Sequence, residues 1–94
     1  MIRFTAAAVS DLERLKNFLS DRNSKAAERA LTQIWLAIEQ LDKFPRLGMV
    51  TDDPDIRQVL VRFGSSGYLI RYAPTAVTGD IIITRVWHGR EKRV

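Results

Sequence analysis

The sequence predicts an α+β fold in which an N-terminal helical hairpin packs on one face of a mostly antiparallel β-sheet. Apolar residues recur every three or four positions through much of the first half, as in amphipathic helices. Three runs in the second half are rich in β-branched and aromatic residues, and turn residues separate them. With a short apolar stretch at the N-terminus, these patterns predict the order β-α-α-β-β-β.

The first two predicted elements are a short strand and a helix. Residues 1–4 suit a brief strand because apolar residues flank a single arginine. Thr5 can cap the helix that follows, although Ser10 and Glu13 match a capping box and give an alternative start. The apolar stripe of this helix consists of Ala8, Leu12, Leu15 and Leu19. Asp11 and Glu13 lie between these positions, so we interpret both as solvated helix residues.

A second helix follows the polar turn at residues 21–24, whose short side chains can bond the first free amides of a helix. Its apolar stripe consists of Ala27, Leu31, Ile34, Ile38 and Leu41, with Trp35 beside it. Pro45 and Gly48 end this helix near Lys43. Because the connection is short, the two helices should lie antiparallel and cover the sheet together.

The second half of the chain predicts the rest of the sheet. Residues 56–63 and 68–72 form a β-hairpin around the glycine and serine turn at 64–67. After a loop at 74–79, residues 80–88 form a third long strand, which is apolar on both faces and therefore suits the centre of the sheet. The helices would cover one face and leave the other open for binding.

Length and composition exclude several kinds of protein. The 94 residues suit one domain, residues 1–94, whose core leaves little apolar surface for an enclosed cofactor cavity. The sequence has no cysteine, no glycine-rich phosphate loop and no histidine cluster, so we expect no cofactor and no metal. It also has no signal-peptide core and no apolar run long enough to span a bilayer. We therefore expect a cytoplasmic protein that does not enter a membrane.

The charge balance favours an anionic partner. Fifteen Lys and Arg against eleven Asp and Glu give a net charge of +4, which suits nucleic acid or an acidic protein segment. Basic residues gather at the C-terminal end, whereas residues 52–55 are acidic. A solvated tail explains this basic end as well as a binding role does.

Several short motifs occur in a characteristic order along nearly the whole chain. They are Ala8-x-x-Asp11-Leu12, Ala27-x-Arg29, Leu41-x-x-Phe44-Pro45-x-x-Gly48, Arg57, Tyr68-Leu69-Ile70-Arg71-Tyr72 and Arg85-Val86-Trp87-His88-Gly89-Arg90. In this order and spacing they resemble the RelE/ParE superfamily of bacterial type II toxins. The resemblance implies a toxin that causes growth arrest, that is associated with plasmid stabilization and that a cognate antitoxin neutralises.

The superfamily contains two activities that the fold does not separate. RelE-like members are ribosome-dependent mRNA endoribonucleases, often with a tyrosine near the C-terminus, and ParE-like members inhibit DNA gyrase. This chain has no aromatic residue after Trp87, and its Tyr-x-Ile-x-Tyr strand looks more like the ParE branch. We therefore expect a gyrase inhibitor rather than an enzyme. The alternatives are a ribonuclease acting on the ribosome and mRNA, and a toxin-derived interaction domain without toxic activity.

The candidate contacts for a target or an antitoxin are basic: Arg57, Arg71, Arg85, Arg90, Lys92 and Arg93. In the ribonuclease alternative, the resemblance implies a catalytic set drawn from Arg57, Arg71, Arg85, His88 and Arg90. Guanidinium groups gathered on one exposed face could hold phosphate or carboxylate, but the strand register decides which arginines share a face. Each could equally be a solvated charge with a packed stem.

His88 and the two tryptophans have both a functional and a structural interpretation. His88 could carry a proton near neutral pH, but a histidine at a strand end is more often a structural hydrogen-bonding group. Regular alternation puts Arg85, Ile83 and Trp87 on one face and His88 on the other, unless a bulge intervenes. Trp35 and Trp87 could stack on bases, but in so small a domain we favour core packing for both.

Overall fold

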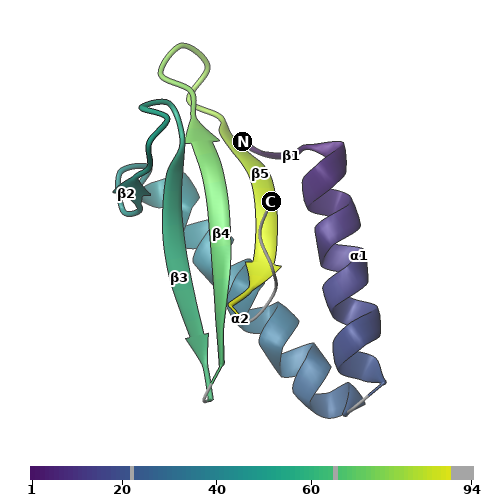
Figure 1. Cartoon of the computed structure of the whole chain (residues 1–94). Helices are drawn as coiled ribbons and strands as arrows, with labels where there is room; N and C mark the ends of the chain where they lie inside the picture. The colour runs from purple at the N-terminus through teal and green to yellow at the C-terminus, as the bar shows by residue number, and fades with distance from the viewer. Residues whose placement is uncertain (22, 65, 90–94) are drawn as a thin grey trace.

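Two helices and a mixed β-sheet make up the fold (Figure 1). The structure is a computed structural model that describes residues 1–21, 23–64 and 66–89. In chain order the elements are β1 (Ile2–Phe4), α1 (Ala6–Ser20), α2 (Ser24–Lys43), β2 (Met49–Val50), β3 (Arg57–Phe63), β4 (Ser66–Pro74) and β5 (Ile81–His88). This confirms the predicted α+β class and adds the short strand β2, which the sequence interpretation missed.

The sheet has the strand order β1-β5-β4-β3-β2. The pair β1 and β5 is parallel, and the other neighbours are antiparallel. β5 therefore lies inside the sheet, as predicted. Because β1 pairs only with Ile81, Ile82 and Ile83, it leaves the later part of β5 without a strand on that side. There α1 takes its place, beside β5 in Figure 1.

Polar side chains cap both helices. The Thr5 hydroxyl accepts a hydrogen bond from the backbone N–H of Ala8 at 3.1 Å, so α1 begins after Thr5 and not at Ser10. The Asn23 side chain accepts one from Ala26 N–H at 3.1 Å and starts α2. α2 ends at Lys43, as the proline and glycine beyond it predict.

The core lies between the helical hairpin and the sheet. The fully buried aliphatic residues of the helices are Leu15, Ile34, Ile38 and Leu41, and the sheet contributes Tyr68, Ile70, Tyr72, Ile81, Ile83 and Val86. Burying each such side chain stabilises the fold by roughly 1.5–3 kcal/mol. We call this side of the sheet the helix-covered face.

Trp35 lies outside this core, so the prediction of core packing is wrong for it. Its side chain is 48% exposed and stacks on Phe4 with 6.2 Å between ring centroids. One residue corresponds to about 100° of rotation around a helix, so the residue after the buried Ile34 points along the side of the hairpin.

A β-bulge in β5 changes the predicted alternation. Arg71 pairs with Arg85 but Tyr72 pairs with Ile83, so Thr84 is an extra residue in β5. Ile83 and Val86 are both fully buried and share the helix-covered face. Ile83 is therefore not on the face of Arg85, contrary to the regular pattern.

Tyr72 fixes the segment between α2 and β2. Its hydroxyl donates to the carbonyl oxygen of Pro45 and accepts from the backbone N–H of Gly48, both at 2.8 Å. A Cβ atom on Gly48 would lie 2.7 Å from the Gln58 carbonyl oxygen and from the Tyr72 ring. Only glycine fits this close approach.

Candidate functional site

The face of the sheet that the helices do not cover is built from alternate residues of β3, β4 and β5. In Figure 1, α2 lies behind β3 and β4. The register places Gln58, Arg71 and Arg85 in one row across these strands, and Leu60, Leu69 and Trp87 in the next. We call these six residues the outer face.

Trp87 makes cation–π contacts with both arginines of the outer face. The guanidinium carbons of Arg71 and Arg85 each lie 4.9 Å from the centre of its ring. A guanidinium is attracted to the negative face of an indole, so these contacts fix both cations beside one aromatic residue. Arg71 also donates from Nε to Gln58 Oε1 at 3.3 Å. Trp87 is buried, as predicted, but on the outer face and not between the sheet and the helices.

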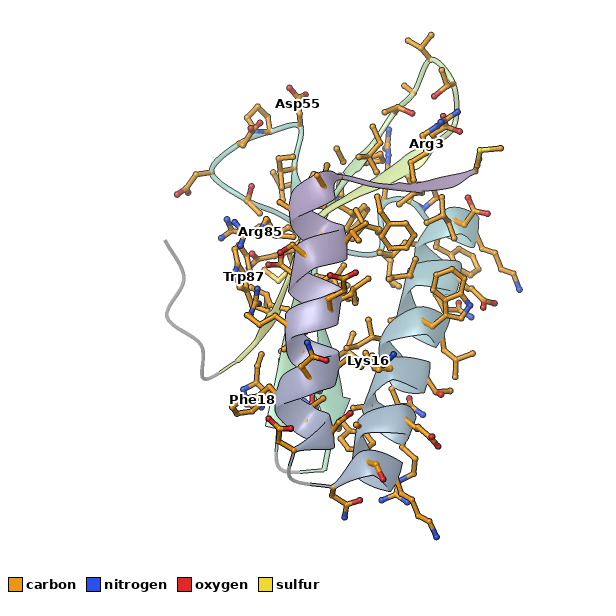
Figure 2. The ribbon with its side chains drawn as sticks, turned by 90° about the vertical axis from the view of Figure 1, so that its right-hand side faces the viewer. Arg3, Lys16, Phe18, Asp55, Arg85 and Trp87 are labelled. Carbon is orange, nitrogen blue, oxygen red and sulfur yellow. The ribbon has the colours of Figure 1, made fainter. Side chains whose placement is uncertain are left out.

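Arg85 also forms an ion pair with Asp11, a buried carboxylate of α1. Asp11 is 2% exposed, and its Oδ2 accepts hydrogen bonds from Arg85 Nε and from the Val86 backbone N–H, both at 2.8 Å. Its Oδ1 accepts from Arg85 Nη2 at 3.1 Å and from Arg14 Nη1 at 2.7 Å. Figure 2 shows Arg85 and Trp87 on the side of α1 that faces away from α2.

The surroundings of Asp11 stabilise its charged form. Burial alone raises the pKa of Asp11, but hydrogen bonds from Arg85, Arg14 and Val86 lower it by more. The pKa therefore lies below the ordinary value of 3.8. Our interpretation of Asp11 as a solvated residue is wrong. The available signal was its spacing, because Ala8, Asp11 and Leu15 are the buried residues of α1 and share one helix face.

Arg57 does not join the other two arginines. It pairs with Tyr72, so its side chain starts from the opposite side of the sheet to Arg71. Its Nη1 donates to the carbonyl oxygens of Gly48 at 2.8 Å and Arg46 at 3.4 Å. Arg57 thus supports the segment before β2. Of the three arginines that could have shared one face, only Arg71 and Arg85 do so.

His88 lies on the helix-covered face. It is 8% exposed and pairs with Tyr68, whose ring meets the imidazole edge-on with 5.3 Å between centroids. Phe18 of α1 packs near it at 6.4 Å. Burial raises the pKa of the Tyr68 hydroxyl above 10.0. His88 therefore points away from the side on which Arg71 and Arg85 lie.

The candidate residues Arg90, Lys92 and Arg93 lie outside the described residues. The sequence still predicts that shortening the chain after Gly89 weakens toxicity more than folding, because three of the five removed residues are basic and the segment offers a core little apolar area.

A groove of about 580 Å³ lies beside Arg71. Its lining residues are Val50, Thr51, Asp52, Asp53, Ile56, Gln58 and Arg71. The loop that carries its acidic side is held by short hydrogen bonds, such as the one from Asp55 N–H to Asp53 Oδ1 at 2.9 Å. The surface next to the outer face therefore offers both signs of charge.

Two further observations concern the described ranges alone. In them, no three His, Cys, Asp or Glu side chains are grouped as a metal site requires. Neither α1 nor α2 has the length and apolar character that crossing a membrane requires.

Comparisons with known proteins show the class to which this fold and surface belong. Residues 2–93 match the family described as the ParE toxin of the type II toxin-antitoxin system, parDE. The chain is therefore a toxin of the RelE/ParE superfamily, as its motifs predicted. Within that superfamily it belongs to the ParE toxin family.

Two relatives come from Caulobacter vibrioides. Toxin RelE1 is 34% identical over 86 residues, which cover 92% of this chain and 89% of the relative. Toxin RelE3 is 35% identical over 85 residues, which cover 88% of this chain and 87% of the relative. Both relatives carry the name RelE, whereas the matching family is the ParE toxin family, so relatedness alone does not decide the target.

Two solved structures share the fold. One is a chromosomal ParDE toxin–antitoxin system from P. aeruginosa, with a TM-score of 0.73 and 16% identity over 93% of this chain and 92% of that chain. The other is the intact E. coli RelBE toxin–antitoxin complex, with a TM-score of 0.63 and 17% identity over 99% of this chain and 98% of that chain.

Proposed function

We propose that this toxin acts by binding and inhibiting DNA gyrase, and that a cognate antitoxin neutralises it. The observation that carries the proposal is the separation of the candidate catalytic residues. Arg71 and Arg85 lie on the outer face, whereas His88 is buried on the opposite face. A ribonuclease needs a base, an acid and cations within reach of one phosphate. The described candidates do not converge on one point, but an inhibitor that works by binding needs no such centre.

The chemistry of the outer face also favours a protein partner. Leu60 is 51% exposed beside the arginine and tryptophan cluster, and Asp52 and Asp53 line the adjacent groove. Arginine and tryptophan are enriched at the energetic centres of protein interfaces. A continuous phosphate backbone would meet repulsion at the two aspartates, whereas a protein surface can match both signs of charge.

The antitoxin part of the proposal has separate support. The ParDE and RelBE structures that share this fold are toxin–antitoxin assemblies. The net charge of +4 favours an acidic segment that folds onto the toxin with salt-dependent affinity. Isothermal titration with the product of the neighbouring gene tests this, and absence of binding at low salt would contradict it.

A RelE-like endoribonuclease is the second candidate. The names of the two relatives at 34% and 35% identity favour it, and the paired Arg71 and Arg85 could hold a phosphate. This alternative needs a proton-transfer group on the outer face in addition to the arginines.

Pulse labelling after induction in cells without antitoxin separates the two targets. We expect DNA synthesis to fall first, with a DNA-damage response, while protein synthesis continues. Arg29→Ala serves as a control that removes one exposed positive charge from α2, and its effect should match that of the unchanged protein. An early collapse of protein synthesis with cleaved ribosome-bound messages would contradict gyrase inhibition and favour the ribonuclease.

A further inference from the structure

The buried carboxylate of Asp11 joins α1 to the outer face. Burying a charge is unfavourable unless the group is paired and hydrogen-bonded. Asp11 meets this condition with two contacts from Arg85, one from Arg14 and one from the Val86 backbone. The contacts from Arg85 and Val86 connect residues more than 70 positions apart in the chain.

One of these contacts completes the edge of β5. After the last pair between β1 and β5, the Thr5 hydroxyl donates to the Thr84 carbonyl oxygen at 2.9 Å. Further along, Asp11 accepts from Val86 N–H, and Arg14 Nη2 lies 3.4 Å from the Val86 carbonyl oxygen. A neutral acceptor would be enough for this purpose. The negative charge therefore requires another explanation.

The Arg85 guanidinium supplies that explanation. Its Nε and Nη2 groups bond the two carboxylate oxygens of Asp11, while the guanidinium carbon lies 4.9 Å from the centre of the Trp87 ring. Such a two-point contact restricts a side chain that otherwise has many rotamers. It also offsets the repulsion between Arg85 and Arg71, which contacts the same ring.

We propose that Asp11 is a positioning residue that fixes the Arg85 guanidinium against Trp87 and so prepares the outer face for its partner. Only the link to toxicity rests on the proposed function. The positioning itself is a property of the isolated protein and is measured without a target.

The test uses Asp11→Asn in a Trp35→Phe background, where Trp87 is the single tryptophan. Asparagine has nearly the same volume and can still accept from Val86 N–H, but it has no charge and one acceptor oxygen. Losing a charge-assisted contact should lower the equilibrium constant for the Arg85 side chain resting in its observed position by about tenfold. We expect faster solvent exchange of the Arg85 Nε–H signal in NMR, a changed Trp87 emission spectrum and reduced toxicity, with cooperative unfolding retained.

Two further variants separate positioning from a purely structural role. Asp80→Asn removes a carboxylate that bonds Arg3 at 2.9 Å on β1, and it should leave the Trp87 emission and toxicity unchanged. Arg85→Lys keeps the positive charge and the Asp11 contact to Val86 but loses the two-point geometry. It should reproduce the emission change, and combining it with Asp11→Asn should add little more.

Unchanged Trp87 and Arg85 signals in a folded Asp11→Asn protein would overturn the proposal. Should that variant not fold, Arg85→Lys decides, because an unaltered Trp87 emission in it would equally contradict positioning. The expected spectral changes, together with gyrase activity that the unchanged toxin does not reduce, would support positioning and count against gyrase inhibition instead.

Discussion

The two faces of the sheet use alternate residues of the same strands for different purposes. On the helix-covered face, Ile70, Ile83 and Val86 are completely buried against the hairpin. On the outer face, Leu60 is about half exposed and the Arg85 side chain is 40% exposed. Substitutions on the first face should therefore reduce stability, and those of exposed residues on the second should reduce binding with little change in stability.

The largest difference between the faces should appear in a pair of aliphatic truncations. Ile38→Ala removes a fully buried side chain of α2 that packs on the sheet, and should lower the free energy of unfolding by about 3 kcal/mol. Leu60→Ala on the outer face should change it by no more than about 0.5 kcal/mol. Urea unfolding measures both. Similar losses in the two variants would contradict the proposed division between the faces.

Asp11 lies where the two faces meet, and its contribution should depend on pH. Because its folded pKa lies below the unfolded value of 3.8, its stabilisation is complete above that value and is lost as pH falls through the folded pKa. Asp11→Asn should lower the free energy of unfolding by about 2 kcal/mol at neutral pH. The difference in free energy of unfolding between Asp11→Asn and the unchanged protein should become smaller below pH 3.8, as acid unfolding curves would show. A gap that is constant or widens in acid would contradict this.

Tyr72 contributes to the helix-covered face through its hydroxyl as well as its ring. Tyr72→Phe leaves Gly48 N–H and the Pro45 carbonyl oxygen without their partner, and should cost about 1–2 kcal/mol. Hydrogen exchange at Gly48 should accelerate, whereas that of the α1 amides should follow only the loss of global stability. Unchanged protection at Gly48 would show that the hydroxyl does not hold this segment.

The smallest effect should come from His88. His88→Gln keeps a polar donor and acceptor but cannot carry a proton near neutral pH. Since His88 is buried on the helix-covered face, we expect slightly lower thermal stability and toxicity within about threefold of the unchanged protein. A folded His88→Gln protein without toxicity would favour the ribonuclease instead.

The sequence predicted what depends on local periodicity and missed what depends on pairing between distant residues. The stripe through Ile34, Ile38 and Leu41 identified α2 and its buried face correctly. β2 was missed because two residues carry too little pattern to identify a strand.

The site was predicted in part for the same reason. Alternation placed Arg85 and Trp87 on one face, but the bulge at Thr84 and the opposite orientation of Arg57 depend on register. The spacing of Asp11 from Ala8 and Leu15 indicates that it is buried, but its role is recognised only when its distant partner Arg85 is known.

The most direct test of the account is a supercoiling assay with purified toxin and DNA gyrase, run in parallel with a cleavage assay on translating ribosomes. We predict that the toxin blocks supercoiling, that the antitoxin restores it, and that messages stay intact. The double variant Arg71→Ala/Arg85→Ala should need at least about tenfold more protein for the same inhibition. Normal supercoiling together with cleaved messages would contradict the account.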